Sequence, residues 1–184
     1  MKTIFALCVL AIAFASVFAF TRPGKCPKPT GPSQSFDLER FLGTWYQIET
    51  SQTDFSHDTH CTQANYKLDS KTGKVAIDTT GVEYKTNAKI VDTSTLHSTD
   101  KSNVFTIGFL PFIKPTKYWV ADTDYNNYAL VVECTNFAGI FYTANAWILS
   151  RNSTLDDGIV RDMKSKLYYG PFGEIDFKFT IQDC

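Results

Sequence analysis

Apolar and polar residues alternate in short runs along most of this chain, a pattern typical of strands with one buried face. Four such runs are expected at 45–50, 62–68, 74–80 and 83–91, and four more at 104–109, 117–122, 128–134 and 143–150. Turn-forming residues separate the runs, most clearly at 69–73, which reads Asp-Ser-Lys-Thr-Gly. Runs at this spacing predict an antiparallel sheet built from hairpins.

The period of the pattern changes after residue 150. Apolar residues then recur every four positions and form one stripe of a helix, at Leu155, Ile159, Met163 and Leu167, with Val160 beside them. Thr154 or Ser153 is expected to cap this helix, and the Gly-Pro pair at 170–171 to end it. A last alternating run follows at 175–181. The chain is therefore predicted to be all-β: an eight-stranded antiparallel up-and-down barrel, closed so that no edge is exposed, with one C-terminal α-helix packed outside.

The segment that leads into the first strand has its own signals. Residues 20–33 carry four prolines, so we expect an extended arm without helix or ladder strand. Residues 35–40 indicate one helical turn capped by Ser35. Gly43 would let the chain turn sharply where a Cβ would obstruct it, and Trp45 would enter the strand as a large rigid side chain.

The N-terminus has the features of a secretory signal peptide. Lys2 precedes an apolar stretch at 4–18, and Val17-Phe18-Ala19 places small residues where a signal peptidase cleaves. We therefore expect a signal peptide at 1–19 and a single secreted domain at 20–184. The 184 residues are 43% hydrophobic and 20% charged, which suits one globular domain.

The cysteines indicate disulfides rather than a metal site. Cys8 lies in the expected signal peptide, which leaves four cysteines in a secreted chain. Their spacing alone allows three pairings. There is no Cys-x-x-Cys sequence, and His57 and His60 are expected to be solvated loop residues, so no metal is predicted. The net charge of −1, without a block of Lys or Arg, argues against a nucleic-acid partner.

Three separated motifs resemble those of the lipocalin family: Gly-Thr-Trp-Tyr at 43–46, Thr-Asp-Tyr-Asn-Asn-Tyr at 123–128 and Trp-Ile-Leu-Ser-Arg at 147–151. The chain is most similar to the apolipoprotein D-like branch, which includes arthropod bilin-binding lipocalins. Further resembling stretches lie at 24–27, 61–66, 118–134 and 146–152, whereas 81–101 matches poorly. The resemblance implies the disulfides Cys26–Cys134 and Cys61–Cys184. It also implies that Arg151 lies across Trp45 at the closed end of the barrel, a structural contact.

The resemblance also implies a ligand cavity lined by aromatic residues. The matching positions are Phe41, Tyr66, Trp119 and Trp147. The period of two along one strand adds three more apolar residues, Phe105, Ile107 and Phe109. Gln47 and Asn145 are in phase with Trp45 and Trp147 and would supply polar groups on the inward face. The alternative is that these side chains fill a packed core.

These features predict a secreted carrier of a small hydrophobic ligand: a lipid, steroid, fatty acid or a pigment such as biliverdin. No cofactor is required, and biliverdin or another hydrophobic chromophore would be cargo. The alternative is a pigment-protein subunit or interaction protein that uses the barrel as a scaffold. An enzyme is not expected, because all four mature cysteines would pair and no Gly-x-Ser-x-Gly, His-Glu-x-x-His or phosphate-loop sequence occurs.

Two further segments concern the surface. Residues 109–113 and 137–142 are apolar although they lie between predicted strands, and we expect both near the open mouth. They would contact a membrane or lipoprotein surface, or else fold inward as lids. Asn152-Ser153-Thr154 is an N-glycosylation sequon, which predicts an exposed and glycosylated Asn152.

Overall fold

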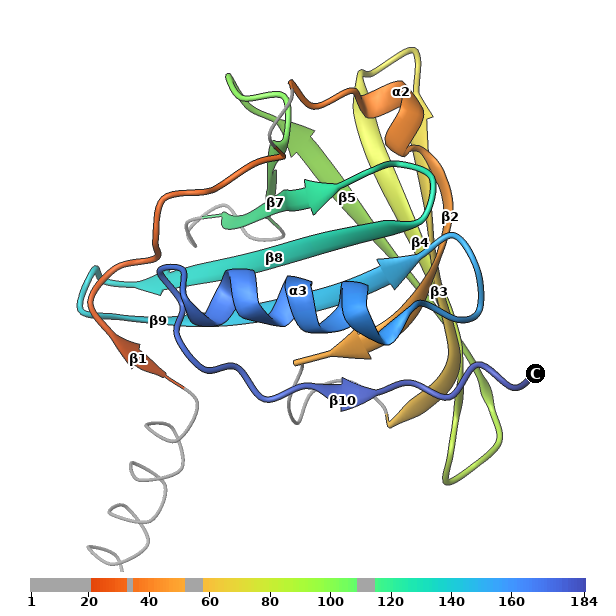
Figure 1. The fold of residues 1–184 in the computed structure, drawn as a ribbon. Coiled ribbons are helices and arrows are strands. Elements are labelled where there is room, and N and C mark those ends of the chain that lie inside the picture. Colours follow the sequence, from red (N-terminus) through yellow and green to blue (C-terminus); the bar gives the residue numbers. More distant parts are fainter. Residues whose placement is uncertain (1–20, 33–34, 52–57, 109–114) are drawn as a thin grey trace, which may run out of the picture.

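The computed structural model describes residues 21–32, 35–51, 58–108 and 115–184. Each of the strands β2 to β9 is antiparallel to the next, and β9 pairs back onto β2, so the sheet closes into an eight-stranded barrel (Figure 1). The strands are β2 (Gly43–Thr50), β3 (Thr59–Asp69), β4 (Lys74–Glu83), β5 (Lys89–Ser98), β6 (Val104–Ile107), β7 (Thr116–Thr123), β8 (Tyr128–Phe137) and β9 (Phe141–Ser150). This confirms the predicted fold class.

The expected strand at 83–91 is wrong. Glu83 ends β4, residues 84–88 form the turn, and the next strand is β5. Asn87 has a φ of 55°, a left-handed conformation that suits a turn. The sequence of β5 does not show the alternation expected of a strand, because polar residues fill its solvated outer face. Thr93 on that face donates a hydrogen bond to Asp78 of β4 (2.9 Å). On the inner face Leu96 is buried.

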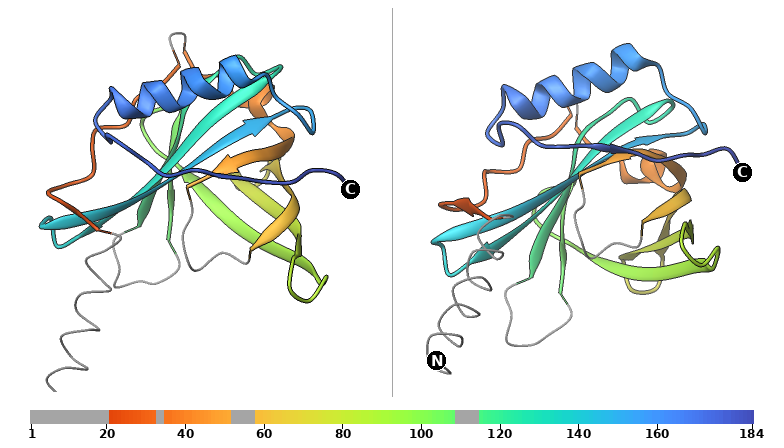
Figure 2. Two further views of the ribbon diagram at one scale, coloured as in Figure 1. Left: turned by 60° about the horizontal axis from the view of Figure 1, so that its bottom comes forward. Right: turned by 90° about the horizontal axis from the view of Figure 1, so that it is seen from below.

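Helix α3 (Asp157–Tyr168) lies along the outside of the barrel, and Figure 2 shows it from two further sides. It buries Val160, Met163 and Leu167 against the outer face of the sheet. The cap is Asp156 rather than Thr154 or Ser153. Its carboxylate accepts from the backbone N–H groups of Gly158 (2.8 Å) and Ile159 (3.3 Å), and an ionised acceptor also complements the helix dipole.

The segment before the barrel also differs from the expectation. Helix α2 (Leu38–Phe41) is capped by Asp37 instead of Ser35, because the Asp37 carboxylate accepts from Arg40 N (3.3 Å). In the arm, β1 (Arg22–Pro23) pairs with β9 over two residues, which corrects the prediction that no ladder forms there. The tail strand predicted at 175–181 is shorter in the structure: β10 (Lys178–Phe179) is the part that forms a strand, and it pairs with β2.

Two disulfides fasten the terminal segments to the barrel. They join Cys26 to Cys134 and Cys61 to Cys184, with Cα–Cα distances of 6.0 and 6.1 Å, as the resemblance implied. The expected signal peptide at 1–19 lies outside the described residues. Within the described part of the chain, no helix is long and apolar enough to cross a membrane.

Candidate ligand-binding site

One end of the barrel is closed by a tryptophan and an arginine. Trp45 is completely buried, and the guanidinium carbon of Arg151 lies 3.7 Å from the centre of its ring. The arginine donates hydrogen bonds of 2.9–3.2 Å to the backbone carbonyls of Arg40, Phe41, Leu42, Thr44 and Tyr125. The indole Nε1 of Trp45 donates to Phe41 O (2.9 Å). Gly43 approaches this arginine with a φ of 95°, which a residue with a Cβ rarely adopts.

Above this floor the barrel encloses a cavity of about 550 Å³. That volume lies within the ~300–1,000 Å³ typical of small-molecule sites. Strands on opposite sides of the barrel supply its apolar wall, which includes Ala64, Tyr66, Ile77, Ile107, Tyr118, Trp147 and Leu149. Its polar lining includes Gln47, Thr62, Thr79, Ser94 and Glu133. The barrel interior is therefore a packed floor beneath an open cup.

Four of the residues predicted to bind ligand line this cavity: Gln47, Tyr66, Ile107 and Trp147. Phe41 and Phe105 are buried, and neither is part of the cavity wall. The ring of Phe41 lies 5.1 Å from that of Trp45 and 5.0 Å from that of Tyr66. Both phenylalanines belong to the packed floor. Phe109 lies outside the described residues.

Trp119 lies on the other side of the sheet from the cavity. It is completely buried, and its ring stacks on Phe172, with ring centres 5.9 Å apart, in the layer beneath α3. Side chains alternate along a strand, and it is the adjacent Tyr118 that faces inward. Helix α3 covers the outer face of the sheet here, so Tyr118 and Trp119 are both buried. The hydrophobic pattern therefore does not reveal which of the two faces the cavity. Trp119 therefore packs in the layer beneath α3 and is not part of the cavity wall.

The two predicted polar groups have different surroundings. Gln47 lines the cavity, and its side-chain amide donates to Thr180 Oγ1 (2.8 Å). Asn145 on β9 is half-buried and pairs in register with Glu133 of β8, two residues before Trp147. It is on the inward side of the sheet without being part of the cavity wall.

Several cavity residues were not singled out by the sequence analysis, and two of them, Tyr118 and Glu133, carry polar groups inside the barrel. The hydroxyl groups of Tyr66 and Tyr118 are hydrogen-bonded to each other inside the barrel. Burial raises the pKa of Tyr66 to about 12, and burial beside Tyr66 also raises the pKa of Tyr118. Glu133 is the second missed feature, and burial raises the pKa of its carboxyl group too. Its signal in the sequence is a single charge within the otherwise apolar run at 129–134.

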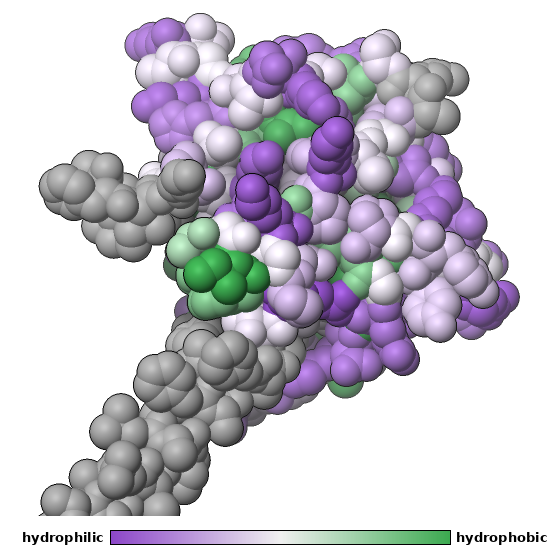
Figure 3. Space-filling view, turned by 90° about the vertical axis from the view of Figure 1, so that its left-hand side faces the viewer, coloured by the Kyte–Doolittle hydropathy of each residue, from purple (hydrophilic) through white to green (hydrophobic). Residues whose placement is uncertain are grey.

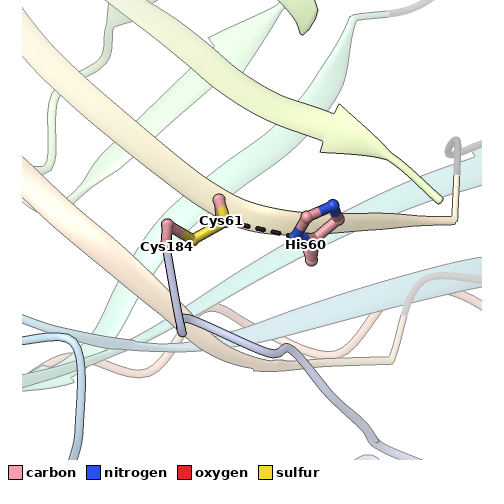
Figure 4. A group of neighbouring side chains, drawn as sticks. All are labelled: His60, Cys61 and Cys184. Carbon is pink, nitrogen blue, oxygen red and sulfur yellow. Dashed lines mark hydrogen bonds between the residues drawn. A yellow bond between two sulfur atoms is a disulfide. The ribbon is translucent and has the colours of Figure 1, made fainter. Parts of the chain in front are cut away.

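A histidine and two cysteines meet where the tail joins β3 (Figure 4). His60 Nδ1 lies 3.2 Å from the sulfur of Cys61, and the sulfurs of Cys61 and Cys184 are bonded to each other. A disulfide offers no thiolate to a metal ion. The His60 ring also stacks on Tyr84, with ring centres 4.7 Å apart, so its role here is packing. His57 lies outside the described residues.

Comparison with known proteins places this geometry in a family. Residues 42–182 match the family model for the lipocalin / cytosolic fatty-acid binding protein family. This chain is a lipocalin. Apolipoprotein D of Cavia porcellus is 35% identical over 146 residues, covering 78% of this chain and 75% of that protein. Insecticyanin-B of Manduca sexta is 30% identical over 152 residues, covering 80% and 73%.

Solved structures agree on the lipocalin fold. Lobster apocrustacyanin A1 superposes with a TM-score of 0.69 at 21% identity, covering 90% of this chain and 92% of that one. Membership of the family identifies the chain as a binding protein for small hydrophobic ligands rather than an enzyme, as the sequence analysis expected.

Proposed function

We propose that this lipocalin is a secreted carrier that holds one small hydrophobic molecule in its barrel cavity. The observation that supports this most directly is the cavity of about 550 Å³ above a sealed floor, with Tyr66, Ile107 and Trp147 in its wall. A ligand that buries about 300 Å² of apolar surface there would gain roughly 7 kcal/mol before the costs of association. The polar lining would set its orientation.

The ligand belongs to one of two chemical groups, a colourless lipid, steroid or fatty acid, or a pigment such as biliverdin. Resemblance to the branch that includes arthropod bilin-binding lipocalins supports the pigment. The visible absorption spectrum of protein purified from its source separates the two groups. A band in the visible region would establish a pigment, and a colourless protein whose organic extract contains lipid would establish the other group.

Tryptophan fluorescence tests the cavity itself. Titration with a fatty acid, a steroid and biliverdin should change the emission of Trp147, which lines the cavity. Trp147→Phe should lose most of that change and bind more weakly. Trp119→Phe is the matched control, because Trp119 lies on the opposite face of the sheet. A signal that survives in Trp147→Phe and disappears in Trp119→Phe would place the ligand outside the barrel.

We also propose that the tip of the β8–β9 hairpin contacts a lipid surface. Phe137 is 40% exposed and Ile140 is 71% exposed at this tip. Figure 3 views the side of the molecule on which the tip lies and shows a hydrophobic patch among hydrophilic residues. Burial of apolar side chains in an interface would allow cargo exchange without passage through water. The other predicted apolar segment, 109–113, lies outside the described residues.

Flotation with neutral phosphatidylcholine vesicles tests this contact. Ile140→Ser should reduce vesicle binding severalfold, whereas Lys67→Ser, an exposed residue on β3, should not. Equal flotation of Ile140→Ser and wild type would exclude the lipid contact. If Ile140→Ser instead abolishes self-association in sedimentation, the tip serves assembly, as the alternative role of a pigment-protein subunit would require.

Asn152 is proposed as a glycosylation site. It is exposed in the bend between β9 and α3, and Ser153 and Thr154 beside it are exposed as well. A glycan there would project into solvent. Digestion of the secreted protein with an N-glycosidase should lower its mass, and Asn152→Gln should abolish the shift.

A further inference from the structure

The cavity wall contains one half-buried carboxyl group, and this group has no hydrogen-bond or ion-pair partner among the described residues. Glu133 on β8 is part of the cavity lining, and burial raises the pKa of its carboxyl group. The other charged residues of the lining, Asp58, Asp92 and Lys178, are all exposed to solvent. Glu133 is thus the least exposed of the charged groups in the cavity lining.

The neighbours of Glu133 do not neutralise its charge. Tyr118 on β7 and Asn145 on β9 are opposite it in register, one on each side. The Tyr118 hydroxyl is already engaged with Tyr66, and the Asn145 amide is uncharged. A partly buried carboxylate without a donor is costly, so its presence in the cavity points to a partner that arrives with the ligand.

Aromatic rings lie on the same wall. The rings of Tyr118 and Trp147 are 6.3 Å apart and tilted by 39°, and both line the cavity with Glu133. The faces of aromatic rings attract cations. A carboxylate beside two aromatic rings is a combination that suits a substituted ammonium group better than an anion.

We infer that this cavity selects an apolar ligand that carries an amine, and that the protonated nitrogen pairs with the carboxylate of Glu133. This inference rests on the proposed carrier function. The pair would gain more in the low-dielectric wall than in water, and a hydrogen bond to an ionised acceptor is stronger than a neutral one. A fatty acid placed the same way would bring its carboxylate towards a like charge, so within the proposed carrier function this inference favours an amine-bearing lipid over a fatty acid or another acidic ligand. An alcohol would gain a hydrogen bond without the charge.

Three probes of equal chain length test the selection: 1-aminododecane, 1-dodecanol and dodecanoate. Affinities are measured by displacement of a neutral fluorescent probe from wild type, Glu133→Gln and the matched control Asp100→Asn. Wild type should bind the amine about tenfold or more tightly than dodecanoate. Glu133→Gln should lose that preference while dodecanol affinity stays within about twofold. Asp100→Asn, exposed in the turn between β5 and β6 and outside the cavity lining, should keep the preference.

The outcomes separate this inference from the carrier function. Dodecanol binding without a preference for the amine would overturn the role of Glu133 and leave the carrier intact. Tighter binding of dodecanoate than of the amine would also overturn the role of Glu133, and so would a preference for the amine that is unchanged in Glu133→Gln. If none of the three probes displaces the fluorescent probe, the inference falls. The carrier function falls as well only if the fluorescent probe, a steroid and biliverdin also fail to bind. Glu133→Ser repeats the comparison with a smaller neutral side chain should Glu133→Gln not fold.

Discussion

Arg151 closes one end of the barrel through both its charge and its geometry. Its guanidinium group lies over Trp45 and donates to backbone carbonyls from α2, β2 and the β7–β8 turn. Those carbonyls belong to residues at or near the ends of these elements. Because the guanidinium is planar and has five N–H donors spread over three nitrogens, it reaches all five carbonyls at once, whereas an ammonium group has three donors on a single nitrogen.

Substitutions at this floor should destabilise the fold. Trp45→Ala should lower the free energy of unfolding by about 3–5 kcal/mol, because a completely buried aromatic ring is lost. Arg151→Lys should cost about 1–3 kcal/mol, since the charge remains but most carbonyl contacts do not. Urea unfolding followed by circular dichroism measures both. An Arg151→Lys protein as stable as wild type would show that the carbonyl contacts contribute little.

The buried tyrosine pair should be visible in an alkaline titration. Burial raises the pKa of Tyr66 to about 12, so neither Tyr66 nor its partner Tyr118 should ionise near pH 10 in the native protein. The folded state then holds these protons while the unfolded state releases them, so stability should fall as pH rises from about 10 towards 12. Absorbance at 295 nm tests this. Tyr118→Phe should remove part of the fall in the free energy of unfolding with pH, which urea unfolding at several pH values measures. An unchanged slope of that free energy against pH would contradict the assignment.

At the scale of elements, the sheet under α3 is buried on both faces. Trp119 and Phe172 pack on the helix side, while Tyr118 faces the cavity. The same strand therefore serves two separate apolar layers, one inside the barrel and one outside. Stability and ligand binding should be separable by mutation, depending on the layer that is changed.

Met163 provides that separation. It is 1% exposed and lies in the outer layer with α3. Met163→Ala should lower the free energy of unfolding by about 2–5 kcal/mol. Affinity for a cavity ligand should stay within about twofold, because the sheet lies between Met163 and the cavity. The exposed Ser165→Ala, on the same helix, should change neither. A large loss of affinity in folded Met163→Ala would show that the two layers are coupled.

The parts of the fold that could be predicted are those whose pattern is local. The alternation in β4 and the four-residue spacing in α3 follow from burial of one face, and both were found from sequence. β5 was misplaced because its polar outer face conceals the alternation. In the site, the inward phase of Tyr118 depends on its pairing with Phe105 across β6 and β7, which no local pattern contains. Glu133 was missed for the same reason, because its place in the cavity wall depends on strand pairing and not on its neighbours in sequence.

At the scale of the whole molecule, the N-terminal arm and the C-terminal tail contact different parts of the barrel. The arm runs outside it, where Cys26 N bonds to Asn136 Oδ1 (2.8 Å) and Asn103 Nδ2 to Thr30 O (2.7 Å). The tail crosses beside β2 and β3, as Figure 2 shows. There Gln182 Nε2 donates to Gln47 O and Thr62 O, both at 2.8 Å. Lys178 and Phe179 of this tail line the cavity, so the tail is part of its wall.

The two disulfides should therefore affect ligand binding differently. They close loops of 108 and 123 residues, and removal of either should lower stability by up to about 4–5 kcal/mol in the chain-entropy model. The variant Cys61→Ser with Cys184→Ser frees the tail, so ligand should dissociate severalfold faster. In Cys26→Ser with Cys134→Ser the arm is freed instead, and dissociation should change little. Stopped-flow displacement from folded protein measures both rates. Equal rates in the two variants would mean that the tail does not retain the ligand.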